Sequence, residues 1–202
     1  MKRNQYTLGK PISFKGNGLH SGIPVTITMR PAPAGSGIIF RRIDLTGAPE
    51  VPAKSEFVTN TLRATTLERG DAKVFTVEHI LSALFALRID NCILEMDAPE
   101  PPVADGGALT FSQMILEAGI MELEKQTDIL TLETSVAVYE DNKFITALPY
   151  DDLRITFTSI NPHPLLGTQM KDFTIDKETY IREIAPSRTI GFTWELEAMR
   201  QM

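Results

Sequence analysis

The chain has 202 residues, of which 43% are hydrophobic and 23% are charged, and its formal net charge is −6. This composition is typical of a globular protein, and the length suits one large domain or two small ones. The negative charge argues against a nucleic-acid-binding protein, which usually carries a basic stripe.

The cysteine content, the N-terminal sequence and the length of the apolar runs also narrow the class of protein. Cys92 is the only cysteine, so no intrachain disulfide can form and the fold does not depend on an oxidising compartment. No apolar run follows Lys2 and Arg3 at the N-terminus, so a secretory signal is not expected. No stretch approaches the roughly 20 apolar residues of a membrane span. We therefore expect a cytoplasmic protein without a transmembrane segment.

The first part of the chain has the pattern of β-strands. Residues 16–18 (GNG) are a turn signal, and apolar residues alternate with polar ones over 24–30. Residues 31–37 are rich in Pro, Gly and Ala and predict a loop. A second strand is predicted over 38–43, and an extended, irregular segment over 57–67.

After residue 75 the apolar residues recur at helical spacing. They predict an amphipathic helix over 77–87, with Thr76 as its N-cap residue. Its apolar stripe consists of Val77, Ile80, Leu81, Leu84 and Phe85. A strand is predicted over 91–96, and Asp105 can cap a second helix that ends near Gly119. The buried face of that helix would consist of Phe111, Met114, Ile115 and Ala118.

The composition becomes polar and charged over 122–128, and we predict a domain boundary there. The first domain is expected to span 1–124 and a second one 125–202. In the second domain the strand pattern starts over, but a full repeat would need strands followed by two helices. We therefore expect the second domain to be incomplete. Its predicted elements are strands over 129–138, 144–148 and 153–159 and helices over 177–184 and 194–202.

Three histidines are present, His20, His79 and His163, and no common catalytic motif includes them. The H-E-x-x-H metalloprotease signature is absent, and no Cys/His cluster has the spacing of a structural zinc site. Neither a G-x-S-x-G elbow, a dinucleotide fingerprint nor a phosphate-binding P-loop occurs.

The pair Glu78–His79 is the strongest candidate for chemistry. Both residues fall in the first turn of the predicted helix, with His79 well off its apolar stripe. A neutral imidazole is the form that binds a metal, and a neighbouring carboxylate can point at a metal-bound water without being a ligand. The alternative stays open, because Glu at a helix start is favourable with the dipole alone and a lone His is often solvated.

Other candidates carry weaker arguments. His20 lies between glycines and can reach a ligand, although a turn histidine that bonds backbone is the commoner case. Lys143, Arg182 and Arg188 can meet phosphates, although isolated cations usually lie at the surface. The Thr189 hydroxyl can donate to an oxyanion, although a threonine without a catalytic role is commoner.

Five motifs occur in an order and at a spacing that resemble a known family. They are 16–22 (GNGLHSG), 76–79 (TVEH), 89–91 (IDN), 104–106 (ADG) and 185–192 (APSRTIGF). The chain resembles the UDP-3-O-acyl-N-acetylglucosamine deacetylases, zinc-dependent amidases of lipid A synthesis, from about residue 5 to its last residue.

The resemblance implies a role for each matching position. His79 matches a zinc ligand, Glu78 the general base that activates the zinc-bound water, and Thr189 a threonine that helps to hold the oxyanion. Four positions match the substrate-binding part: Leu19 and Leu62 near the sugar and acyl pocket, Lys143 near the UDP diphosphate, and Ile190. His20 matches the motif histidine, whose chemical role stays open.

The resemblance also implies what these 202 residues lack. The family's other two zinc ligands, a His and an Asp, and a later catalytic His have no match here, since no histidine follows His163. We therefore expect the complete protein to bind Zn²⁺ and deacetylate a UDP-linked acylated amino sugar, and this chain alone to be inactive. A non-catalytic nucleotide-sugar binding module is the alternative.

The fold that the resemblance implies is α+β, with two similar domains packed helix to helix around the site. Each domain would be a mainly antiparallel sheet with helices on one face, and the second would be incomplete here. In some relatives a dehydratase domain is fused behind the deacetylase, so a fused dehydratase is a possible partner. No nucleic acid is expected as a partner.

Overall fold

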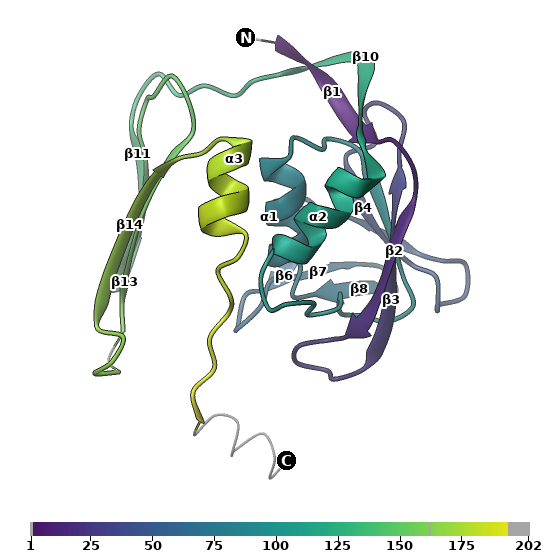
Figure 1. The fold of residues 1–202 in the computed structure, drawn as a ribbon, viewed down its shortest axis with the longest axis horizontal. Helices are drawn as coiled ribbons and strands as arrows, with labels where there is room; N and C mark the ends of the chain where they lie inside the picture. The colour runs from purple at the N-terminus through teal and green to yellow at the C-terminus, as the bar shows by residue number, and fades with distance from the viewer. Residues whose placement is uncertain (1, 162, 194–202) are drawn as a thin grey trace.

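The computed structural model describes residues 2–161 and 163–193, and its class is α+β with mostly antiparallel sheets and few helices (Figure 1). The largest sheet has five strands in the order β2-β3-β9-β4-β5, and only the β4–β9 pair is parallel. Its strands are β2 (Ile12–Asn17), β3 (Pro24–Pro31), β9 (Cys92–Met96), β4 (Ile38–Arg42) and β5 (Glu50–Pro52). The strands predicted over 24–30, 38–43 and 91–96 are thus confirmed.

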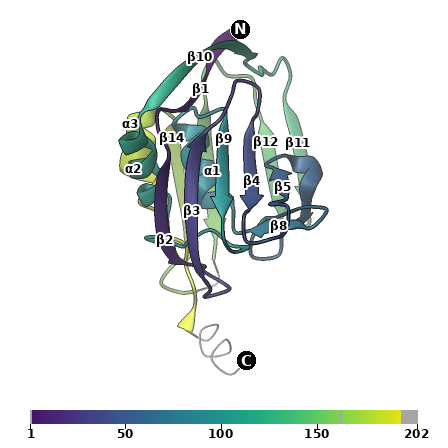
Figure 2. The same cartoon turned by 90° about the vertical axis from the view of Figure 1, so that its right-hand side faces the viewer.

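A smaller antiparallel sheet and two helices complete this part of the fold. The sheet consists of β6 (Val58–Asn60), β7 (Thr66–Arg69) and β8 (Ala72–Phe75), and a short 3-10 helix, η1 (Ser55–Phe57), precedes it. The helices α1 (Glu78–Ala86) and α2 (Leu109–Ala118) pack against each other. Figure 2 shows β2, β3, β9 and β4 side by side with α1 behind them.

The core lies between the five-stranded sheet and these helices. Phe40 and Leu94 from the sheet, Ile80 and Leu84 from α1 and Phe111 from α2 are all buried in one apolar cluster. Burial of such side chains stabilises the fold by roughly 1.5–3 kcal/mol each, so this cluster is the main source of stability. The face predicted for α2 is confirmed, since its four members are all buried, and Gly119 (φ 76°) ends the helix as expected.

Three local predictions are wrong: the N-cap of α1, the burial of Phe85 and the position of the turn after β2. Thr76 is not the N-cap of α1: Val77 is, and the Thr76 hydroxyl donates to Glu100 instead. Phe85 is 67% exposed, because it is turned by about 100° from the buried Leu84 on the helix. The turn signalled by residues 16–18 begins only at Gly18, after β2 has ended.

Asp105 is close to its predicted role but does not occupy the N-cap position of α2. The N-cap residue is Ala108, which makes no side-chain cap. The Asp105 carboxylate accepts a hydrogen bond from the Thr110 hydroxyl at 3.0 Å. The carboxylate therefore still lies at the positive end of the helix, where it is favourable.

The strands β1 (Lys2–Leu8) and β10 (Ile120–Asp128) pair antiparallel over their whole lengths. Asp90 fixes the N-terminal end, since its carboxylate accepts two hydrogen bonds from the Arg3 guanidinium at 2.7 Å and one from the Tyr6 N–H at 2.8 Å. The polar segment over 122–128 is thus a strand rather than a linker. The domain boundary near residue 124 falls within β10 and stays a prediction.

Two antiparallel hairpins follow: β11 (Val136–Glu140) with β12 (Lys143–Ala147), and β13 (Arg154–Ile160) with β14 (Thr168–Thr174). Strand β11 begins later than the predicted strand over 129–138, and β14 was not predicted. The helix predicted over 177–184 is confirmed as α3 (Lys177–Thr179), which continues as a π-helical turn, η2 (Tyr180–Ile184). The helix predicted over 194–202 lies outside the described residues.

Helix α3 and η2 lie between the hairpins and α1 in Figure 1. Tyr180 is only 3% exposed, belongs to the core cluster, and forms a 2.7 Å hydrogen bond with the Ser82 hydroxyl of α1. No helix in the part that the structure describes is long and apolar enough to cross a membrane.

The buried thiol of Cys92 gives a prediction about reactivity. Burial raises its pKa to about 12, so the reactive thiolate is scarce at neutral pH and the sulfur is covered. We expect Ellman's reagent to leave the native protein unmodified and to titrate one thiol per chain in concentrated guanidinium chloride. The variant Cys92→Ser is the blank. Rapid modification of the native protein would contradict the placement of Cys92 in the core.

Candidate functional site

The first turn of α1 places Glu78 and His79 side by side at the surface. Glu78 is exposed and His79 is half-buried, whereas Ile80, the next residue, points into the core. The Glu78 carboxylate accepts a hydrogen bond from the Thr65 backbone N–H, which joins it to the segment between β6 and β7. The pair therefore lies at the positive end of a helix whose opposite face is anchored in the core.

A turn over residues 18–22 lies next to this helix start, and Glu100 connects the two. The Glu100 carboxylate accepts hydrogen bonds from the N–H of His20 at 3.0 Å and of Ser21 at 2.8 Å. It also accepts the Thr76 hydroxyl at 2.8 Å. The side chains of Leu19 and His20 stay exposed on this turn.

Glu100 is fully buried, and its charge is compensated by hydrogen bonds. Burial alone would raise the pKa of this carboxyl, but the hydrogen bonds from His20, Ser21 and Thr76 outweigh burial and hold the pKa below its ordinary value of 4.5. Glu100 therefore stays an anion at neutral pH although water does not reach it.

The segment that carries Thr189 and Ile190 is held at the start of α2. Ala108 donates its N–H to the carbonyl of Ala185 at 2.9 Å, and Thr189 donates its N–H to the carbonyl of Gly106 at 2.8 Å. The backbones approach closely because residue 107 is glycine: a Cβ there would lie 2.8 Å from the carbonyl oxygens of residues 185 and 187. The side chains of Thr189 and Ile190 are exposed.

The other two predicted site residues lie on separate elements. Leu62 follows β6, is 80% exposed, and donates its N–H to the Asn60 side chain at 2.7 Å. Lys143 is the first residue of β12 and is exposed. Its hairpin lies across α3 from α1 (Figure 1). The structure thus places Glu78 and His79 next to each other, and Glu100 connects the start of their helix to the turn that carries Leu19. Lys143 lies apart from them, on the β11–β12 hairpin.

The described residues do not by themselves make a metal site. Over 2–161 and 163–193, no three His, Cys, Asp or Glu side chains are grouped to hold an ion. A catalytic zinc takes three protein ligands, so His79 alone is not sufficient. His163 instead shapes its own loop, since its Nδ1 accepts the Leu165 N–H at 3.2 Å and its ring stacks on Phe192 at 5.7 Å.

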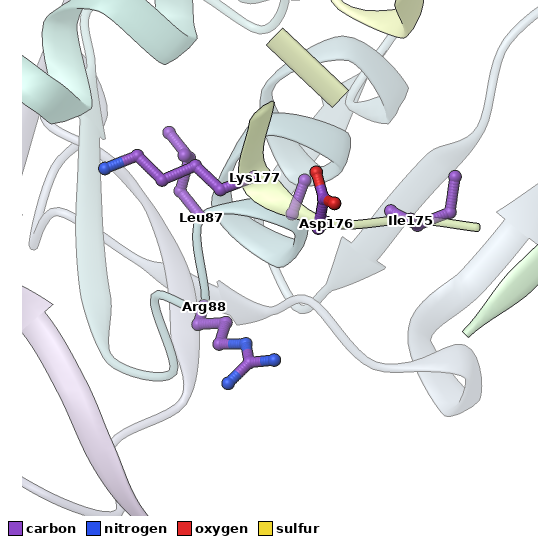
Figure 3. A pocket seen from close by; sticks show the side chains of 6 residues that line it. Leu87, Arg88, Ile175, Asp176 and Lys177 are labelled. Carbon is purple, nitrogen blue, oxygen red and sulfur yellow. The ribbon is translucent and has the colours of Figure 1, made fainter. Parts of the chain in front are cut away.

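A hollow of about 170 Å³ lies at the other end of α1 (Figure 3). Leu87 and Arg88 line it from the C-terminal end of the helix, and Ile175, Asp176 and Lys177 line it from the segment that enters α3. It is therefore separated from Glu78 by the length of the helix and does not belong to the candidate site.

Comparison with known proteins shows which family the chain belongs to. Residues 5–202 match the model of the family described as UDP-3-O-acyl N-acetylglycosamine deacetylase. The chain belongs to this deacetylase family. The resemblance carried by the five motifs, to the N-terminal portion of these enzymes, is thereby confirmed.

Individual relatives are similar over almost the whole chain. A UDP-3-O-acyl-N-acetylglucosamine deacetylase of Myxococcus xanthus is 41% identical over 199 residues, which are 98% of this chain and 63% of the relative. One of Geobacter sp. (strain M21) is 39% identical, over 97% of this chain and 64% of the relative. The bifunctional enzyme LpxC/FabZ of Chlorobaculum tepidum is 43% identical, over 97% of this chain and 42% of the relative. The chain thus spans less than two thirds of the length of these deacetylases.

Glu100 is the residue of this site that the sequence analysis missed. One signal was available, because a glutamate between Pro99 and Pro101 is a charged side chain in a rigid loop. Its partners, however, are the Thr76 hydroxyl 24 residues away and the groups of His20 and Ser21 about 80 residues away. Neither separation follows from a local pattern.

The lowered pKa of Glu100 predicts how stability depends on pH. Because the folded-state pKa lies below the unfolded one, the carboxylate stabilises the fold fully above pH 4.5 and less as the pH falls through the folded-state pKa. At neutral pH we expect Glu100→Gln to lower the free energy of unfolding by about 1–3 kcal/mol. The difference in free energy of unfolding between the Glu100→Gln variant and the unsubstituted protein should be smaller in acid.

Urea titrations at neutral pH and at about pH 3 measure this difference, at two values on either side of the ordinary carboxyl pKa. The matched control is Glu117→Gln, at an exposed position of α2. A difference that stays constant down to the acid range would show that Glu100 does not act as a buried anion.

Proposed function

We propose that the protein takes part in the zinc-dependent hydrolysis of the N-acetyl group of a UDP-3-O-acyl-N-acetylglucosamine in lipid A biosynthesis. Membership of the deacetylase family is the observation that carries the proposal. The adjacent Glu78 and His79 at the start of α1 support it, since they are the residue types that amide hydrolysis at a metal centre uses.

In this proposal the catalytic residues of the chain are Glu78 and Thr189. Glu78 is exposed on one side and bonded to the Thr65 N–H on the other, so its carboxylate is oriented and can take a proton from an attacking water. The Thr189 hydroxyl donates to the oxyanion that forms on the acetyl carbonyl. Its backbone is held to Gly106 at the start of α2, which restricts where the hydroxyl can lie.

His79 is proposed as one ligand of Zn²⁺, with the remaining ligands supplied from outside these 202 residues. We therefore propose that the chain alone is inactive. Leu19, Leu62 and Ile190 are exposed apolar side chains that can contact the sugar and the acyl group. Lys143 is exposed and can pair with the diphosphate.

The architecture we propose has two similar domains, 1–124 and 125–202, packed helix to helix, with the second one incomplete in these residues. The pairing of α1 with α2 and the contact of Tyr180 with Ser82 support a helical layer between the two. We also propose a cytoplasmic location. A fused dehydratase is a possible partner, since one relative is named a bifunctional enzyme.

Zinc binding tests the proposal that His79 is the one zinc ligand that the 202-residue chain provides. We expect the 202-residue chain to bind zinc only weakly in equilibrium dialysis, because one imidazole does not hold the ion against a mild chelator. His79→Ala should remove this weak binding, and His163→Ala, the matched control, should not. One tightly held zinc per chain would show that the chain provides a complete site.

Activity tests the role of Glu78. Residues 1–202 would be joined to the remaining third of the Geobacter relative, and acetate release from a UDP-3-O-acyl-N-acetylglucosamine would be measured. We expect Glu78→Gln to lower kcat by roughly 10²–10⁴-fold, the usual contribution of a general base. Glu117→Gln is the matched control. Full activity of the Glu78→Gln protein would exclude Glu78 as the base.

The alternative function is a nucleotide-sugar binding module without catalysis. It is favoured by one observation: the described residues contain no group of three side chains that could hold a metal, whereas Leu19, Leu62 and Ile190 are exposed. Titration of the 202-residue chain with UDP by calorimetry distinguishes it, and an absence of binding at millimolar ligand would exclude this alternative.

A further inference from the structure

Glu100 is a charged side chain with no exposed surface, and it lies on the loop that connects β9 to α2. A buried carboxylate is costly unless its lone pairs are satisfied. Its partners are the backbone N–H groups of His20 and Ser21 and the hydroxyls of Ser21 and Thr76, all neutral. The site therefore keeps a buried negative charge by hydrogen bonding alone.

The first pair of partners fixes the turn over residues 18–22. The His20 N–H bonds both carboxylate oxygens, at 3.0 and 3.1 Å, and the Ser21 N–H bonds one of them at 2.8 Å. Gly18 is part of the same fit: a Cβ there would come within 3.0 Å of the Glu100 carboxylate, closer than real Cβ atoms approach. The turn is thus shaped to wrap the carboxylate.

The third partner fixes the residue at which the chain enters α1. Thr76 has φ 59°, a left-handed conformation that costs of order 1–3 kcal/mol for a residue of this kind. Its hydroxyl donates to Glu100 at 2.8 Å, and its N–H donates to the carbonyl of Thr65 at 3.1 Å. The N–H of the same Thr65 bonds the Glu78 carboxylate. A continuous path of hydrogen bonds thus runs from the turn through Glu100 and Thr76 to Glu78.

We propose that Glu100 is a positioning residue for the Glu78–His79 pair: its buried carboxylate locks the turn of His20 and the left-handed Thr76 into one arrangement, which sets where the first turn of α1 begins. The catalytic consequence rests on the proposed function, whereas the locking of the two segments does not. A general contribution to core packing is the competing explanation, and the two make different predictions about distant amides.

Amide hydrogen exchange in the 202-residue chain tests the locking directly. Thr76→Val replaces the hydroxyl with a methyl group, so it removes the hydrogen bond to Glu100 and keeps the amide partners of Glu100 on the turn. If Glu100 couples the two segments, exchange at the His20 and Ser21 amides should rise about tenfold, while the amides of β3 and β9 keep their rates. In a Glu100→Gln background the same Thr76→Val change should have no further effect. Thr146→Val, at an exposed position of β12, is the matched control.

Two results of this experiment would overturn the proposal. Unchanged exchange at His20 and Ser21 in the Thr76→Val protein would show that the segments are independent. An equal rise at β3 and β9 would show that the substitutions act only through global stability. Thr76→Val serves as the first variant because it keeps the buried carboxylate and its two amide partners, so it should fold even where Glu100→Gln does not.

Kinetics test the catalytic consequence in the fused protein described above. We expect Glu100→Gln to lower kcat about tenfold and to change KM by less than about twofold, since a misplaced base slows the reaction without removing a substrate contact. A loss confined to KM, or no loss, would overturn the positioning role. If the unsubstituted fused protein releases no acetate, the proposed function fails, and the exchange experiment alone decides whether Glu100 locks the two segments.

Discussion

The geometry of the candidate site depends on the hydrogen bonds that the buried Glu100 carboxylate accepts. The carboxylate is bonded to a turn from the beginning of the chain and to the residue that leads into α1, although these segments lie more than 50 residues apart in the sequence. An anion in this position orients several donors at once, because each N–H or O–H must point at it. The conformation of Thr76, which would be unfavourable alone, is thereby maintained.

The second constraint is the layer formed by α1 and α2. Each helix presents one apolar face to the five-stranded sheet, and the ends of the helices face the segments that carry the candidate residues. Glu78 and His79 occupy the start of α1, and Gly106 at the start of α2 holds the backbone of Thr189. Core packing and the placement of the chemistry therefore depend on the same two elements.

Features with local causes could be predicted from the sequence. Helix α2 follows from apolar residues at helical spacing and a terminal glycine, and β3 follows from strict alternation. The pair Glu78–His79 was found in the same way, as two residue types at a helix start. Features with distant causes were missed: β14 is almost entirely exposed, has little apolar pattern, and is formed through its pairing with β13. Thr76 looked like a local cap because its partner, Glu100, is 24 residues further along the chain.

The contact between Tyr180 and Ser82 has a consequence for how the chain folds. These residues are separated by 98 positions, and β1 pairs with β10 across a similar separation. Closing loops of this length costs entropy before any contact compensates for it, and proteins rich in such contacts fold slowly. The two hairpins, whose pairings are local, can form early. We therefore expect the attachment of η2 to α1, and the contact of Thr189 with Gly106 that follows it in the chain, to form late in folding.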